Sequence, residues 1–206
     1  AFIYYGGSEG WSEGRHQRLP APVCTSVAAG DFNGDGRPDL AFLCNGKVRL
    51  FYQSELGFEP KRFVDLEIEG DQLGAGDVDG DGIDDILMMS LDSCVVLNGR
   101  DGSFLQPPIS PPAIFGAGAW TAYGSIVFAD LNGDGQEEQL SCANHGIWGA
   151  MSRQRQPLWM LDPGPEMMAQ RHGGLADVDG DGALELAVAH PGEVRCYAAA
   201  TGMLKW

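Results

Sequence analysis

The residues of this chain that are best suited to chemistry are carboxylates, and they are concentrated in four short segments. The segments share the nine-residue pattern D-x-[DN]-G-D-G-x-x-[DE] and begin at Asp31, Asp77, Asp130 and Asp177, at intervals of 46, 53 and 47 residues. They hold 16 of the 29 acidic residues but one basic residue, Arg37. Because closely spaced carboxylates repel one another, this arrangement predicts a bound cation.

Calcium is the cation that these donor groups favour, because it takes six to eight oxygen ligands in a flexible shell. Positions one, three, five and nine of each segment supply side-chain oxygens, and position seven is expected to supply its backbone carbonyl. Glycines at positions four and six let the backbone curl around the ion. One calcium ion per segment is predicted, about four in all. The expected ligands are Asp31, Asn33, Asp35, Arg37 and Asp39; Asp77, Asp79, Asp81, Ile83 and Asp85; Asp130, Asn132, Asp134, Gln136 and Glu138; and Asp177, Asp179, Asp181, Ala183 and Glu185.

The acidic segments are not EF-hand loops, which need an acid at the twelfth position and a helix on each side. The twelfth positions here are Phe42, Met88, Ser141 and Val188. Apolar runs such as LAFLC and ILMM follow the segments, and small-residue runs such as VAAG and LGAG precede them. Such short runs are typical of buried strands. Each acidic segment is therefore predicted to join two β-strands.

The spacing of the segments indicates a repeat architecture. Further strand patterns complete each repeat, for example KVRLFYQ after the turn at Asn45 and Gly46. Four short antiparallel strands in about 45 residues correspond to one blade of a β-propeller. The predicted fold is therefore all-β, a propeller of four-stranded antiparallel blades with a calcium loop between strands one and two of each blade.

The form GDFNGDGRPDL resembles the FG-GAP/VCBS repeats of integrin α-chain propellers and of many secreted bacterial proteins, and the likeness extends over nearly the whole chain. The resemblance implies calcium in the acidic loops and one partial or assembling propeller over residues 1–206. The last unit, GEVRCYAAATGMLKW, also resembles PQQ-type propeller blades. The implied units are a half blade at 1–22 and blades at 23–70, 71–112, 113–169 and 170–206.

About four and a half blades would leave open sheet edges, which invite pairing with other strands. Further blades of a larger protein are the favoured partner for these edges, and other copies of the chain are the alternative. A protein or carbohydrate ligand is expected in addition. Nucleic acid is not an expected partner. Outside the acidic segments the chain has 13 acidic and 12 basic residues, and the basic residues form no continuous stripe that could neutralise phosphates. The sequence contains no apolar run that predicts a membrane span.

Calcium loops with many exposed waters suit an extracellular or secreted location, the periplasm and the cell surface included. The cysteines lie in predicted strands at no metal-ligand spacing, and we expect buried free thiols. A disulfide between Cys24 and Cys44, which flank the first acidic segment, is the alternative. The five cysteines are Cys24, Cys44, Cys94, Cys142 and Cys196.

The sequence shows no catalytic motif, so no catalytic residue is assigned, and a non-enzymatic role is favoured over an enzymatic one. The leading hypothesis is a calcium-binding extracellular module for recognition, adhesion or assembly. A lectin-like, carbohydrate-binding propeller is the second, with Trp120, Tyr123 and Trp148 as aromatic residues that could stack on sugars; the alternative for each is a place in the core. The third is the propeller portion of a polysaccharide lyase or a quinoprotein-like enzyme.

Overall fold

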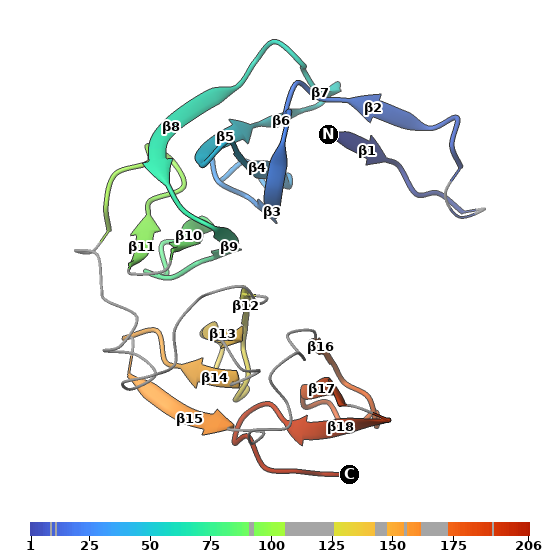
Figure 1. Ribbon diagram of the computed structural model, residues 1–206, viewed down its shortest axis with the longest axis vertical. Helices are drawn as coiled ribbons and strands as arrows, with labels where there is room; N and C mark the ends of the chain where they lie inside the picture. The colour runs from blue at the N-terminus through green and yellow to red at the C-terminus, as the bar shows by residue number, and fades with distance from the viewer. Residues whose placement is uncertain are drawn as a thin grey trace.

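The computed structural model describes residues 1–8, 10, 12–90, 93–105, 126–142, 148–154, 156–161, 173–190 and 192–206. Within these residues the chain is all-β: strands β1 to β18 form small antiparallel sheets, and no helix occurs. No described segment is a helix that could cross a membrane. The sheets follow one another along an open arc, and the N-terminal and C-terminal sheets lie at its two ends, on either side of the opening (Figure 1).

Two sheets and a small hairpin come from the N-terminal part of the chain. The N-terminal sheet consists of β1 (Phe2–Tyr4) and β2 (His16–Arg18). The first sheet has the order β3 (Cys24–Gly30), β4 (Asp39–Cys44), β5 (Lys47–Phe51) and β8 (Val64–Glu69). Between β5 and β8 the chain forms the hairpin of β6 (Gln53–Ser54) and β7 (Gly57–Phe58).

Three further sheets repeat the order of the first. The second sheet contains β9 (Gln72–Gly76), β10 (Asp85–Met89) and β11 (Cys94–Leu97). The third contains β12 (Ile126–Ala129), β13 (Glu138–Cys142), β14 (Trp148–Met151) and β15 (Pro157–Leu161). The fourth contains β16 (Gly173–Ala176), β17 (Glu185–His190) and β18 (Glu193–Ala198). Single bridges, Leu97 to Phe104 and Tyr197 to Leu204, mark the place of an outer strand in the second and fourth sheets.

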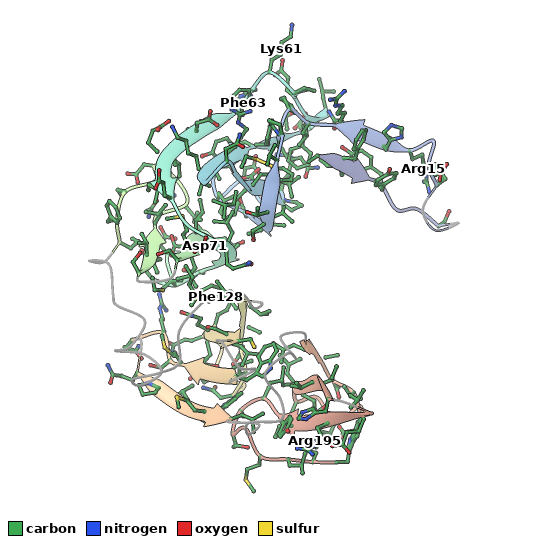
Figure 2. The ribbon with its side chains drawn as sticks, in the orientation of Figure 1. Arg15, Lys61, Phe63, Asp71, Phe128 and Arg195 are labelled. Carbon is green, nitrogen blue, oxygen red and sulfur yellow. A yellow bond between two sulfur atoms is a disulfide. The ribbon has the colours of Figure 1, made fainter. Side chains whose placement is uncertain are left out.

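The acidic segments occupy the place that the sequence predicts. They connect β3 to β4, β9 to β10, β12 to β13 and β16 to β17, always the first two strands of a sheet. The first strand is rich in small residues because neighbouring first strands lie close together: β3 lies beside β9, and β9 lies beside β12. At Gly76, for example, an added Cβ would lie 2.3 Å from the Phe128 side chain of β12, which Figure 2 labels.

Among the described residues, the hydrophobic core forms four clusters, each between two consecutive sheets. Leu19 and Phe51 lie between the N-terminal and first sheets, and Leu43 and Ile86 lie between the first and second. The second and third sheets share a cluster with Leu87 and Met151, and the third and fourth share one with Leu140 and Leu186. Second strands such as β10 are buried on both faces, which explains their unbroken apolar sequence. No sheet buries its apolar residues alone, so the sheets stabilise one another.

One expectation about the cysteines is wrong. Cys24 and Cys44 form a disulfide, whereas buried free thiols were expected at both positions. A register shift between Cys24 and Ser26 places Cys24 directly opposite Cys44, with their Cα atoms 4.1 Å apart. Without this shift the register of the other pairs, such as Ser26 with Leu43, would have placed Thr25 opposite Cys44. Cys94, Cys142 and Cys196 are buried thiols, as expected.

Loss of this disulfide is expected to lower the free energy of unfolding by about 3 kcal/mol, because it closes a loop with a sequence separation of 20 residues. Chemical denaturation of the Cys24→Ser/Cys44→Ser double variant would measure this change. Dithiothreitol should destabilise the wild type by a similar amount and leave the double variant unaffected. Equal denaturation midpoints for oxidised and reduced wild type would contradict the prediction.

Candidate metal centres

The first aspartate of each acidic segment organises the backbone of its loop. Asp31 Oδ1 accepts hydrogen bonds from the N–H groups of Gly34 at 2.8 Å and Asp35 at 3.0 Å, and its Oδ2 accepts one from Gly36 at 2.7 Å. Asp130 makes the same three contacts in the third loop. All eight glycines at positions four and six have positive φ, from 74° to 88°. The predicted conformation of these glycines is confirmed, and other residues adopt it only with strain.

The last acid of each segment is buried. Asp39, Asp85, Glu138 and Glu185 are between 0% and 3% exposed. In the second, third and fourth loops this carboxylate accepts a hydrogen bond from the N–H of position two, for instance from Leu131 to Glu138 at 2.9 Å. Asp39 Oδ2 accepts no hydrogen bond from any residue that the structure describes. A buried carboxylate oxygen without a partner is costly, and a cation would satisfy it.

The predicted side-chain ligands converge in the second and fourth loops. Carboxylate oxygens of Asp77, Asp79 and Asp85 lie within 4.8 Å of one another, and those of Asp177, Asp179 and Glu185 do the same. These residues are positions one, three and nine of their segments. The donor set consists of hard oxygens and therefore fits calcium.

The third loop brings positions three, five and nine together in a different way. The Asn132 side-chain amide donates to Asp134 at 3.2 Å and to Glu138 at 3.0 Å. Position five also supports position seven, since the carboxylate of Asp134 accepts the N–H of Gln136 at 2.9 Å. Ligation by the backbone carbonyls of position seven stays a prediction.

Burial and backbone contacts shift the pKa values of the loop acids in opposite directions. Burial raises the pKa of Asp39 to about 6 and that of Asp85 to about 7. The pKa of Glu138 is also raised, chiefly by burial. By contrast, the N–H group of Gly135 holds the pKa of Asp130 below its usual value. In the first, second and third loops the buried acid at position nine therefore ionises with difficulty unless a cation is near.

The calcium-free protein is therefore expected to become less stable as the pH rises from about 4 to about 7. Asp39 and Asp85 hold their protons up to pH values of about 6 and 7 in the folded chain, but lose them near their ordinary pKa of 3.8 when unfolded. Their contribution to stability is complete below about pH 4 and is lost as the pH rises through the folded pKa values. Melting temperatures in EGTA at constant ionic strength would show this slope. The Asp39→Asn/Asp85→Asn double variant should flatten it, and an unchanged slope would contradict the prediction.

Position eight of the segments has a role that the sequence reasoning missed. Asp84 Oδ2 accepts the N–H of Asp31 at 2.7 Å, and the N–H of Asp84 donates to the carbonyl of Asp31 at 3.1 Å. Glu137 likewise accepts the N–H of Asp77 at 3.2 Å. The acid at position eight therefore ties its loop to the first ligand residue of the preceding loop. The signal was the surplus of acids in these two segments beyond the predicted ligand set.

The aromatic residues considered for sugar stacking do not form a described site. Trp148 is 1% exposed and belongs to the core between the third and fourth sheets, so the stacking hypothesis is wrong for this residue. Its burial follows from its place at the start of β14, directly opposite Cys142 of β13. Trp120 and Tyr123 lie outside the described residues.

A family model described as FG-GAP-like repeat matches residues 31–88 and 77–141. The two matches together extend from the first acidic segment to β13 and cover more than half of the chain. The chain belongs to the FG-GAP-like repeat family. The matches include the first three acidic loops, the strand after each of them, and the strands β9 and β12 that precede the second and third loops. No curated protein matches the chain.

Solved structures similar to this FG-GAP-like chain share its fold at low sequence identity. The V. cholerae biofilm matrix protein Bap1 is 22% identical with a TM-score of 0.53, over 89% of this chain and 30% of that chain. BBS1N in complex with ARL6DN is 14% identical with a TM-score of 0.60, over 98% and 60%. The Photorhabdus luminescens Tc holotoxin pore is 20% identical with a TM-score of 0.52, over 95% and 10%. The FG-GAP-like chain thus spans less than two thirds of each of these proteins.

Proposed function

We propose that this chain is part of a calcium-stabilised β-propeller that acts outside the cell in recognition, adhesion or assembly, and that its acidic loops bind calcium for structure and not for catalysis. The observation that carries the proposal is the buried acid at position nine of every loop, which lies next to the more exposed acids of the same loop. In Asp39 this acid has an oxygen without a hydrogen-bond donor among the described residues. A hard cation would satisfy the buried oxygen and neutralise the exposed acids together.

The succession of sheets supports a propeller. Consecutive sheets pack face to face through shared clusters, their first strands lie side by side, and the series follows an arc (Figure 1). In this proposal residues 1–22 form a half blade, and residues 23–70, 71–112, 113–169 and 170–206 form blades. A radial arrangement of this kind leaves only short strand edges exposed within the ring.

The two ends of the arc support completion by further blades or by other copies of the chain. Position two of the first three loops is buried, but Val178 at the same position of the fourth loop is 47% exposed. At the other end, Phe2 and Tyr4 of β1 are 56% and 53% exposed. Apolar residues at both ends suit contact with sheets like those that cover the equivalent residues within the chain.

The extracellular location is supported by the disulfide of Cys24 and Cys44, because disulfides persist in oxidising compartments. Calcium loops are also suited to calcium concentrations outside the cell. A role in adhesion or assembly draws support from the likeness to Bap1, which is described as a biofilm matrix protein.

Isothermal titration calorimetry of the calcium-stripped protein tests the calcium part of the proposal. We expect binding by at least the first three loops, and loss of one site in the variant Asp79→Asn/Asp85→Asn, which removes two ligands but keeps the side-chain size. The matched control is Asp65→Asn, an acid of the first sheet that pairs with Arg49 at 2.6 Å and lies in no loop. Absence of calcium binding in the folded wild type would refute the proposal.

Carbohydrate binding is a second candidate function, favoured by a polar cavity of about 580 Å³. It lies between the first and second sheets, at the strand ends opposite the acidic loops, and is lined by Asn45, Glu69, Asp71, Ser90 and Ser93 among others. Asp71 follows β8 and is labelled in Figure 2. Hydrogen-bonding groups of this kind suit sugar hydroxyls. Glycan-array binding that Asp71→Ala abolishes and Asp65→Asn preserves would support this function, and an array without any bound glycan would exclude it for the sugars present.

A further inference from the structure

The fourth acidic loop already contains a cation, and it comes from the chain itself. Lys205 Nζ donates to Asp179 Oδ2 at 2.6 Å, to Glu185 Oε1 at 2.8 Å and to Asp181 Oδ2 at 3.3 Å. These acids are positions three, five and nine, three of the four side chains predicted to hold calcium in this loop. The lysine side chain is 26% exposed and that of Glu185 is 1% exposed, so the contact with Glu185 is shielded from water.

The backbone of the C-terminal segment fixes the position of this lysine. The N–H of Lys205 donates to the carbonyl of Cys196 in β18 at 2.8 Å, and the N–H of Cys196 donates to the carbonyl of Trp206 at 2.8 Å. Gly202, with φ of 68°, allows the turn that leads from β18 into the segment. Lys205 is therefore held in place by strand-like backbone pairing with β18. A lysine in an ordinary surface ion pair has no such backbone restraint.

Nothing similar occurs at the other loops within the described part of the chain. In the first loop, Arg37 contacts one acid of the loop, Asp35, at 3.3 Å, and its other partner is Glu55 outside the loop at 3.4 Å. In the second loop, Arg153 donates to the carbonyl of Val78 at 2.9 Å. No described Lys or Arg bridges two acids of the first, second or third loop. The fourth loop differs from them in its cation and not in its acid pattern.

We propose that the Lys205 ammonium is the resident cation of the fourth loop, which orders this loop without calcium and competes with calcium for Asp179, Asp181 and Glu185. The inference rests on the proposed calcium function of the other three loops. Calcium and the ammonium need the same carboxylate oxygens, so calcium enters only when three charge-assisted hydrogen bonds are broken. The fourth loop is therefore the weakest calcium site, and its occupation displaces the Lys205 ammonium from the loop.

Lysine labelling with an amine-reactive ester, read by mass spectrometry, tests the ammonium contact directly. The chain has three lysines, Lys47, Lys61 and Lys205. In EGTA we expect Lys205 to react at least about tenfold more slowly than the control Lys61, a ratio that corresponds to about 1.4 kcal/mol. Calcium high enough to fill all four loops should remove this protection. Equal reactivity of Lys205 and Lys61 in EGTA would overturn the proposal.

Calcium titration of Lys205→Met tests the competition. The variant keeps the length and apolar stem of the side chain but loses the ammonium, so its fourth site should bind calcium at least about tenfold more tightly than that of the wild type. Lys61→Met is the matched control and should bind as the wild type does. Four equivalent sites in the wild type, unchanged in Lys205→Met, would overturn the proposal. Absence of calcium binding by every loop of both proteins would instead refute the proposed function, while the labelling result would still decide whether the ammonium occupies the loop.

Discussion

Removal of calcium is expected to lower the melting temperature of the whole chain by at least several degrees and at most by tens of degrees. At a free calcium concentration one hundred times the dissociation constant, one occupied loop stabilises the fold by about 2.7 kcal/mol. In a chain of this size each kilocalorie shifts the melting temperature by about 2–4 °C, so a single loop accounts for roughly 5–11 °C. Without the ion, carboxylates about 4 Å apart repel by about 1 kcal/mol per pair even in water.

The loss should spread beyond the loops, because each core cluster belongs to two sheets. Phe32 and Val78, at position two of the first and second loops, are 0% and 7% exposed and lie in the clusters between consecutive sheets. When a loop opens, its residue at position two leaves the core cluster between the two sheets. The adjacent sheet then loses part of its packing. We therefore expect one broad transition at a lower temperature in EGTA, and not the loss of isolated loops.

Limited proteolysis in EGTA provides a local measurement of the same prediction. Cleavage should begin at the Gly-Asp-Gly steps of the first three loops, at residues 34–36, 80–82 and 133–135. The fourth, at 180–182, should resist cleavage because Lys205 holds its acids. Wild type in millimolar calcium is the control. Identical melting curves and digestion patterns with and without calcium would show that the loops do not stabilise this fold.

Local chemistry explains why the loops and strands could be predicted from the sequence. Glycines at positions four and six adopt positive φ in every loop, and the small and apolar runs on both sides form the first two strands of each sheet. These features depend on residues that are close in sequence. The burial of Asp39 and Asp85 could have been inferred in part, since each of them begins a buried strand.

Features that depend on a second segment were not predictable in this way. Cys24 and Cys44 lie opposite each other only because of a register shift, and no residue type in the sequence indicates that shift. The contact of Asp84 with Asp31 joins two sheets, and the contact of Lys205 with Glu185 brings the C-terminal segment back to a loop 20 residues earlier. The first contact requires the packing of one sheet on the next, and the second requires the path of the chain after β18; the periodicity of the sequence determines neither.

Phe32→Ala is expected to lower the free energy of unfolding by about 3–5 kcal/mol, the usual cost of truncating a buried aromatic residue. Phe32 is fully buried between the first and second sheets and contributes to the same cluster as Ile86 and Leu97. Its position within an acidic loop would suggest a surface residue. A large loss of unfolding free energy in Phe32→Ala would therefore show that this loop residue packs in the core between the two sheets. Urea denaturation in saturating calcium would measure it. A change below about 1 kcal/mol, the typical size for substitutions that create no cavity, would contradict the burial of Phe32.

The valines at the same position of two other loops offer a matched comparison for this result. Val78 is 7% exposed against the third sheet, whereas Val178 is 47% exposed at the end of the arc. Val78→Ala removes buried methyl groups and should cost roughly 1.5–3 kcal/mol, whereas Val178→Ala should be nearly neutral in this chain. In an assembly that completes the ring, through further blades or other copies, Val178 would be covered, and Val178→Ala should then become as destabilising as Val78→Ala. A neutral Val178→Ala in that assembly would show that its partner contacts a different surface.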